Sequence, residues 1–221
     1  MLSSDTVWSR AESGEPDQIS AQMYNLTIGL TLLWGFGVNY YMIKTISVEQ
    51  VMAIGFLPLI IGYFVSCFFG IYLYTSSDSP VVSFIGYNFV VVPIGIILVP
   101  FISAYDPLVI EKALYATGAV TSTMMMLGGI YPKFFLSIGR VLFLSLVLAI
   151  VAELVMLFMN IHQPALLDWA VAVIFCGYIG FDWARANTLP KTYDNAVDSA
   201  ASLYLDIINL FIRLVRILGK R

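Results

Sequence analysis

The fold of this chain is decided by the stretch Ala200-Ala201-Ser202-Leu203-Tyr204-Leu205-Asp206-Ile207-Ile208-Asn209-Leu210-Phe211-Ile212-Arg213. It is apolar enough for a membrane interior, yet it has a carboxylate at its centre. At about 3.6 residues per turn, the polar side chains in and beside it share one helical stripe roughly 100° wide. The members of this stripe are Ser199, Ser202, Asp206, Asn209, Arg213 and Arg216. Because lipid offers such a stripe no partners, we expect a central helix whose polar face meets a cavity or another helix.

The composition is that of an integral membrane protein. Of 221 residues, 60% are hydrophobic and only 11% are charged, and the mean hydropathy is +0.88. Soluble domains carry about 25% charged residues. Four charge-free runs, each sufficient for the roughly 20 residues of a membrane-spanning helix, and three further apolar stretches that carry a few charges predict an all-α protein with seven spans. The expected spans are Tyr24–Ile43, Gln50–Tyr74, Val81–Ile102, Pro107–Ile130, Leu136–Met159, Ala165–Arg185 and the stretch quoted above.

These spans form a single predicted transmembrane domain over residues 23–221, preceded by a short mobile tail over residues 1–22 that contains no cleaved signal peptide. Tyr131-Pro132-Lys133 is expected to be a turn, and residues 186–196 the last loop. The net charge of −3 argues against nucleic acid as a partner. Cys67 and Cys176 lie in apolar runs and indicate buried thiols, and His162 is interpreted as an ordinary loop residue. With no pattern of catalytic, metal-ligating or phosphate-binding residues, we expect neither a cofactor nor an enzyme.

Three acids fall within the predicted spans, namely Glu153, Asp182 and Asp206. Asp182 can pair with Arg185 one turn later. An antiparallel hairpin of the last two helices would also bring Asp182 and Asp206 to similar depth. Two carboxyl groups in a dehydrated site cannot both ionise cheaply, so we expect them to share a proton. Such a pair can sense pH while it coordinates a hard cation such as Ca²⁺, or it can activate water as an aspartic protease does.

At these residues the chain resembles the Bax inhibitor-1 family, also called the transmembrane Bax inhibitor motif family. The segment Ser202–Phe211, followed by Leu214 and Ile217-Leu218-Gly219, is similar to the C-terminal signature of that family. Weaker agreement comes from Ala113-Leu114-Tyr115-Ala116-Thr117 and from Phe134 through Phe158. The sequence separation of Asp182 and Asp206 also matches that of the paired aspartates in bacterial members. The resemblance covers roughly residues 105–219.

The resemblance implies a fold in which a central seventh helix is wrapped by the other six. It also implies a monomeric, pH-sensitive calcium leak channel in the plasma membrane of a prokaryote. The number of Lys and Arg residues in the loops does not decide the orientation in the membrane, and the resemblance implies a cytosolic N-terminus. In bacterial members the two aspartates, here Asp182 and Asp206, sense pH, gate the pore and meet the permeant Ca²⁺ transiently. Lipid, Ca²⁺ and protons are the implied partners, and other membrane proteins are further candidates.

Two departures from the family pattern concern the site. Bacterial members carry an arginine at the end of the second helix that latches onto the aspartate pair, but Gly70–Ser77 has no basic residue here. Arg185 or Arg213 is therefore a candidate latch. The fifth helix has Met156 where the family has asparagine, and it carries Glu153 one turn earlier. We treat Glu153 as a candidate pore-lining acid or a structural residue, and Ser202 and Asn209 as further candidate pore residues.

Two other functions compete with the leak. A non-conducting regulator that binds other membrane proteins would use the polar stripe as structural glue. An intramembrane aspartic protease also places one aspartate on each of two helices. Those enzymes carry Tyr-Asp and Gly-x-Gly-Asp contexts and a Pro-Ala-Leu element after the second aspartate. Here Asp182 follows Gly180-Phe181, Asp206 follows Tyr204-Leu205, and Pro164-Ala165-Leu166 comes before both aspartates.

Overall fold

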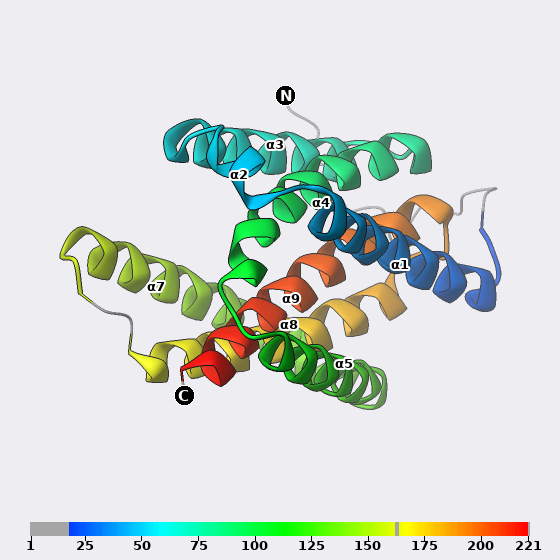
Figure 1. Ribbon diagram of the computed structural model, residues 1–221. Coiled ribbons are helices and arrows are strands. Elements are labelled where there is room, and N and C mark those ends of the chain that lie inside the picture. The colour runs from blue at the N-terminus through cyan, green and yellow to red at the C-terminus, as the bar shows by residue number, and fades with distance from the viewer. Residues whose placement is uncertain (1–17, 162–163, 221) are drawn as a thin grey trace, which may run out of the picture. The chain divides into compact units, whose positions relative to one another are not determined.

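The computed structural model describes residues 18–161 and 164–220, and within these ranges the secondary structure is entirely helical (Figure 1). The helices are α1 (Ala21–Thr45), α2 (Val48–Met52), α3 (Phe56–Ser76), α4 (Pro80–Ser103), α5 (Pro107–Ile130), α6 (Pro132–Ser137), α7 (Gly139–Phe158), α8 (Ala165–Thr188) and α9 (Tyr193–Gly219). The predicted loop residue His162 and most of the predicted tail, residues 1–17, lie outside the described ranges. The all-helical prediction is confirmed.

The chain divides into two compact units. The first contains the described residues up to Ala104 together with Leu189–Ala201, and the second contains Tyr105–Thr188 and the residues from Ser202 onward. The helix α9 therefore begins in the first unit and ends in the second. The prediction of a single domain over residues 23–221 stays a prediction.

The predicted helix Gln50–Tyr74 is wrong in its first third, where the chain forms two helices. Gly55 separates α2 from α3 with a φ of 85°, a left-handed conformation that glycine adopts without a steric penalty. The short helix α2 begins with a capping box, in which the Ser47 hydroxyl accepts a hydrogen bond from the Gln50 amide and the Ser47 amide donates to the Gln50 side chain. Glu49 lies in the first turn of α2. Hydrogen bonds from its own backbone amide and from Ser47 lower the pKa of the Glu49 carboxyl group.

Other boundaries also differ from the prediction, and local chemistry explains two of them. The predicted helix Leu136–Met159 begins only at Gly139, since Leu136 belongs to the separate short helix α6. Pro132 does not lie in a turn but begins α6, at the first helical position, where a missing backbone N–H costs nothing. The predicted loop 186–196 is largely helical, because α8 continues to Thr188 and α9 begins at Tyr193. The Thr192 hydroxyl accepts a hydrogen bond from the Asn195 amide at 3.1 Å, as a helix-capping side chain does. The predicted tail is also too long, since α1 already begins at Ala21.

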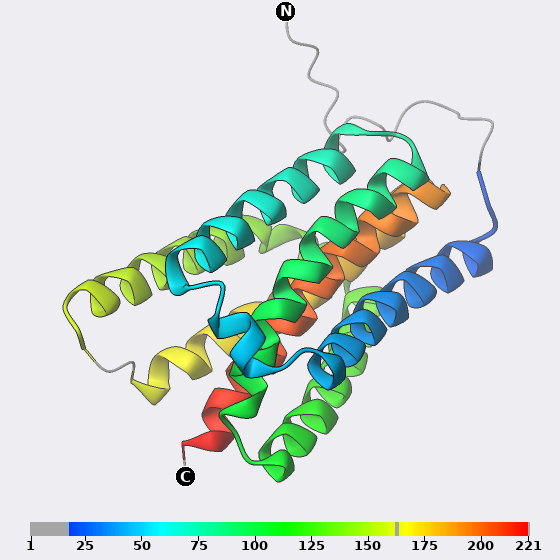
Figure 2. The ribbon, with the colours of Figure 1, turned by 45° about the horizontal axis from the view of Figure 1, so that its top comes forward.

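In the first unit, α4 packs against both α1 and α3 (Figure 2). The Ser66 hydroxyl donates to the Phe89 carbonyl at 2.7 Å, which ties α3 to α4. On the other side of α4, the Tyr87 hydroxyl donates to the Thr31 carbonyl of α1 at 3.0 Å. Pro93 and Pro100 lie inside α4 as predicted, and Tyr87 is fully buried.

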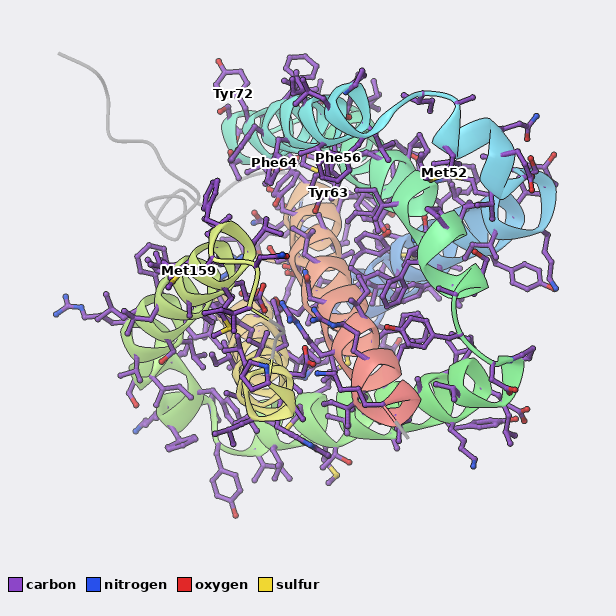
Figure 3. The ribbon with its side chains drawn as sticks, turned by 60° about the vertical axis from the view of Figure 1, so that its left-hand side comes forward. Met52, Phe56, Tyr63, Phe64, Tyr72 and Met159 are labelled. Atoms are coloured by element: carbon purple, nitrogen blue, oxygen red, sulfur yellow. The ribbon has the colours of Figure 1, made fainter. Side chains whose placement is uncertain are left out.

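Six of the helices are long and apolar enough to cross a membrane, and these are α1, α3, α4, α5, α7 and α8. Large apolar side chains are exposed along them. In α3, for example, Phe56, Phe64 and Tyr72 are 79%, 51% and 64% exposed (Figure 3). Such a surface suits lipid and not water, so the chain is a membrane protein with several spans. The helix α9 is 27 residues long but is not among the six, and a seventh span stays a prediction.

In the second unit, α8 packs against α5, α6 and α7. The backbones of α5 and α8 come close together at Gly128 and Gly180, where a Cβ on Gly128 would overlap the carbonyl oxygen of Gly180. Gly180 precedes Asp182 by little more than half a helical turn. The contact therefore holds the part of α8 that carries the predicted site directly against α5.

We expect Gly128→Ala to destabilise the protein by about 1–3 kcal/mol, because an added methyl group must push two helix backbones apart. The matched control is Gly118→Ala in the same helix, where an added Cβ meets nothing within 4 Å. That change should be neutral or stabilising by up to about 1 kcal/mol, through the better helix propensity of alanine. Thermal unfolding in detergent measures both variants, and equal melting temperatures would contradict the close contact.

Candidate functional site

The structure brings Asp182 of α8 and Asp206 of α9 together in the second unit. The side chains of Asp182 and Asp206 lie close enough to interact electrostatically, and the residues are only 7% and 6% exposed. Two carboxyl groups this close together in a buried site cannot both ionise cheaply, so we expect the pair to share a proton. The expectation that the last two helices place these residues side by side is confirmed. Their role as pH sensor and gate stays a prediction.

Arg185 links this pair to α9. Its Nη1 atom lies 3.4 Å from Oδ1 of Asp182, and its Nη2 atom donates to the Ser202 hydroxyl at 3.2 Å. The pairing of Asp182 with Arg185 predicted from their spacing is confirmed. The phenol of Tyr178, one turn before Asp182, lies close enough to interact electrostatically with both carboxyl groups. A guanidinium group thus bridges the two helices one turn from the pair, as a latch would.

Glu153 and Arg213, two other candidates from the sequence, belong to a separate ionic cluster in the same unit. Nη1 of Arg213 lies 2.5 Å from Oε1 of Glu153 in α7 and 3.1 Å from Oδ1 of Asp168 in α8. Arg216 and Lys220 also contact Asp168, at 3.4 Å and 2.7 Å. One guanidinium nitrogen thus connects three helices, and Glu153 is half of an ion pair.

Sequence reasoning missed Asp168, although its carboxylate is fully buried and is contacted by three cations. It lies in the first turn of α8, where an acid is ordinarily a solvated helix-start residue. A signal was present in the spacing, because Asp168 and Asp182 are separated by roughly four helical turns at about 3.6 residues per turn. A separation close to a whole number of turns places both acids on the same face of α8.

The remaining candidate, Asn209, donates its side-chain amide to the Leu205 carbonyl within α9, at 2.8 Å. It is half-buried. Its candidate role in a pore is not addressed by this contact and stays a prediction.

A second buried polar group lies in the first unit, at the start of α9. The Ser83 hydroxyl donates to Asp194 at 2.8 Å, and the hydroxyl groups of Tyr24 and Ser199 are 3.0 Å apart. The Lys191 ammonium lies 4.4 Å from the centre of the Tyr24 ring, and burial lowers the pKa of Lys191. The sequence analysis did not single out Asp194 and Asp198 as buried polar residues. Both continue the helical stripe of Ser202 and Asp206 toward the N-terminus of α9.

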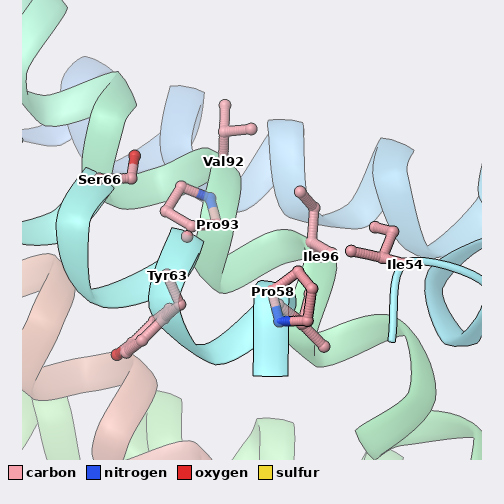
Figure 4. Close-up of a pocket in the computed structure, with 9 residues that line it drawn as sticks. Ile54, Pro58, Tyr63, Ser66, Val92, Pro93 and Ile96 are labelled. Carbon is pink, nitrogen blue, oxygen red and sulfur yellow. The ribbon is translucent and has the colours of Figure 1, made fainter. Parts of the chain in front are cut away.

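The first unit also contains a cavity of about 270 Å³ between α3 and α4 (Figure 4). Its walls are mostly apolar, and none of the lining residues carries a charge. The lining residues are Ile54, Pro58, Leu59, Gly62, Tyr63, Ser66, Val92, Pro93 and Ile96. The cavity offers no charged ligand for a cation, so it does not resemble an ion site.

The donor set at the aspartate pair is small for a resident metal. Within residues 18–161 and 164–220, no cluster of three or more His, Cys, Asp or Glu side chains could hold a metal ion. Bound Ca²⁺ usually takes about six to eight oxygen ligands. A transient contact of Asp182 and Asp206 with a passing ion that keeps most of its water is what the family resemblance implies, and it stays a prediction.

Comparison with known proteins places these features in a family. The sequence profile described as "Inhibitor of apoptosis-promoting Bax1" matches residues 17–221. The chain belongs to the Bax inhibitor-1 family. The resemblance seen in the segment Ser202–Phe211 is thereby confirmed and extends over nearly the whole chain, including the helices before residue 105.

Curated relatives of this Bax inhibitor-1 chain come from bacteria and plants. A BI1-like protein of Arabidopsis thaliana is 35% identical over 91 residues, which are 40% of this chain and 35% of the relative. Protein LIFEGUARD 4 of the same plant is 37% identical over 83 residues, 36% of this chain and 33% of the relative. A membrane protein of Vibrio cholerae is 35% identical over 114 residues, 51% of this chain and 50% of the relative. The chain thus spans about a third to a half of the length of these relatives.

Proposed function

We propose that this chain is a proton-regulated calcium leak in the plasma membrane of a prokaryote, with a cytosolic N-terminus. In this proposal α9 is a seventh, central helix, and Asp182 and Asp206 form the pH sensor and the gate. The observation that carries the proposal is the adjacent pair of buried carboxyl groups on α8 and α9, which lies beside Arg185. Membership of the Bax inhibitor-1 family supports it.

The proposed gate works through the shared proton. At acidic pH the proton is present, and its sharing in a hydrogen bond between the two carboxyl groups would hold α8 against α9. As pH rises the proton is lost, and two carboxylates a hydrogen-bond length apart repel each other. The repulsion favours an arrangement in which the helices separate or a cation lies between the carboxylates. Flux should therefore rise with pH and fall again on acidification.

The test is Ca²⁺ entry into liposomes that contain the purified protein and a trapped dye, measured from pH 5 to pH 8. We expect flux in the wild type to rise at least several-fold over this range. Asp182→Asn and Asp206→Asn should each abolish the pH dependence, since an amide cannot lose the proton. Glu111→Gln is a matched control, because Glu111 is an exposed acid of the same unit, and its pH profile should equal that of the wild type.

Two outcomes would refute the proposal. An unchanged pH profile in both aspartate variants would remove the pair from the gate. Flux no greater than that of empty liposomes at every pH would favour the competing function, a non-conducting regulator of other membrane proteins. Cleavage of a transmembrane substrate that Asp206→Asn abolishes would instead support the protease.

A further inference from the structure

Asp168 is a buried carboxylate with three cationic partners, and the proposed gate does not use it. Asp168 is 0% exposed. Its Oδ1 atom accepts from Arg213 at 3.1 Å and lies 3.4 Å from Nε of Arg216, while its Oδ2 atom accepts from Lys220 at 2.7 Å. A buried carboxylate without such partners would be strongly destabilising. Both of its oxygens are therefore committed to α9 and to the residue that follows it.

The contacts of Asp168 and of the aspartate pair lie on the same faces of the same two helices. On α8, Asp168 and Asp182 share a face, as their separation of roughly four turns requires. On α9, Arg213 follows Asp206 by roughly two turns, which returns it to the stripe of Asp206. Lys220 continues that stripe just past the end of the helix. The two helices are thus joined at two levels, which are about 20 Å apart along α8 at about 1.5 Å per residue.

This arrangement determines the rotation of α9 about its own axis. Neighbouring residues on a helix differ by about 100°. A rotation of that size would turn Arg213 and Lys220, which share nearly one direction on α9, away from Asp168 and break the hydrogen bonds to both of its carboxylate oxygens. The same rotation would turn Asp206 away from Asp182. The ionic cluster therefore opposes the motion that would misplace the carboxyl pair.

We propose that Asp168 is a positioning residue, which fixes the rotation and axial position of α9 relative to α8 and so keeps Asp206 facing Asp182. Arg213 extends this anchor to α7 through Glu153. Arg185 and Tyr178 of α8 lie near the Asp182–Asp206 pair. Asp168 does not contact this pair and acts on it only through α9. Its effect on flux rests on the proposed function, whereas its effect on helix position does not.

The test measures a distance between α8 and α9 by double electron–electron resonance. Spin labels are placed at Asn187→Cys on α8 and Ile212→Cys on α9, in a background of Cys67→Ala and Cys176→Ala, in lipid nanodiscs. We expect a single narrow distance distribution with Asp168 present. Asp168→Asn should at least double the width or add a second population. Asp168→Glu, which keeps the carboxylate, should restore most of the narrow distribution, and Glu111→Gln should leave it unchanged.

The flux assay supplies a second measurement on unlabelled protein. We expect Asp168→Asn to reduce the change in flux between pH 5 and pH 8 at least threefold, and Asp168→Glu to recover it. A broadened distribution in a protein that shows no flux at all would contradict the leak and still support the positioning role.

An unchanged distance distribution in Asp168→Asn would overturn the proposal, whatever the flux. If that variant does not fold, Lys220→Gln replaces it, because the Lys220 side chain is 37% exposed and its loss leaves both arginines in place. We then expect a smaller but measurable broadening, and a distribution equal to that of Glu111→Gln would overturn the proposal equally.

Discussion

Arg213→Met is expected to lower the melting temperature of the protein in detergent by about 6 to 12 °C. Removing one partner of a buried ion pair typically costs about 3–5 kcal/mol, and each kcal/mol corresponds to about 2–4 °C in a chain of this size. Here the change removes from Glu153 the cation that lies 2.5 Å away, while Asp168 retains Arg216 and Lys220. We therefore expect a loss of about 3 kcal/mol, the lower end of the free-energy range, which corresponds to about 6 to 12 °C.

The double variant Arg213→Met with Glu153→Met tests the cause. Replacing both partners by apolar side chains removes the uncompensated carboxylate, so we expect it to recover at least half of the lost melting temperature. Arg140→Met, at an exposed arginine of α7, is the control for the substitution itself and should change the melting temperature by less than about 2 °C. A double variant less stable than Arg213→Met alone would contradict the ion pair.

Arg185→Gln is expected to raise Ca²⁺ flux at pH 5 by about tenfold, toward the level of the wild type at pH 8. Arg185 contacts Asp182 and donates to Ser202, so its loss removes the contacts that would hold α9 against α8 in the proposed closed arrangement. A tenfold change corresponds to about 1.4 kcal/mol, close to the worth of one hydrogen bond that involves a charged group. The dye assay in liposomes measures it directly.

Two further variants make this prediction specific. Arg185→Lys keeps the positive charge but loses the fork that reaches two partners at once, so we expect an intermediate flux at pH 5. Arg140→Gln removes an exposed arginine from the same unit and should leave flux unchanged. If Arg185→Gln lowers flux at every pH, Arg185 is not a latch and instead supports the conducting state.

The sequence predicted the apolar helices well, because membrane spans depend on long runs of residues and not on single positions. The helix Pro107–Ile130 was predicted with the observed bounds. The errors occurred where one residue decides the backbone. Gly55 interrupts a continuous apolar run through its positive φ, and neither hydropathy nor length reports such a conformation.

The candidate site was partly predictable for a similar reason. Asp182 and Asp206 stood out as acids inside apolar runs, and the hairpin of the last two helices implied their contact. Asp168 did not stand out, because its burial depends on three cations that lie far along the chain, at the C-terminal end of α9 and just beyond it. The pairing of distant charges depends on the tertiary structure. Hydropathy alone therefore underestimates how much charge a membrane protein can bury.

The ion pairs of Arg213 have a consequence for the order of biosynthesis. Translation proceeds from the N-terminus, so the carboxylates of Glu153 and Asp168 are synthesised before the cations of α9 that neutralise them. Before α9 is synthesised these acids lack its cations, and lipid does not solvate an ionised carboxylate. The helix α9 is in turn too polar to be a confident membrane segment by its own composition. We therefore expect the helices that carry Glu153 and Asp168 to insert stably only once the cations of α9 are present.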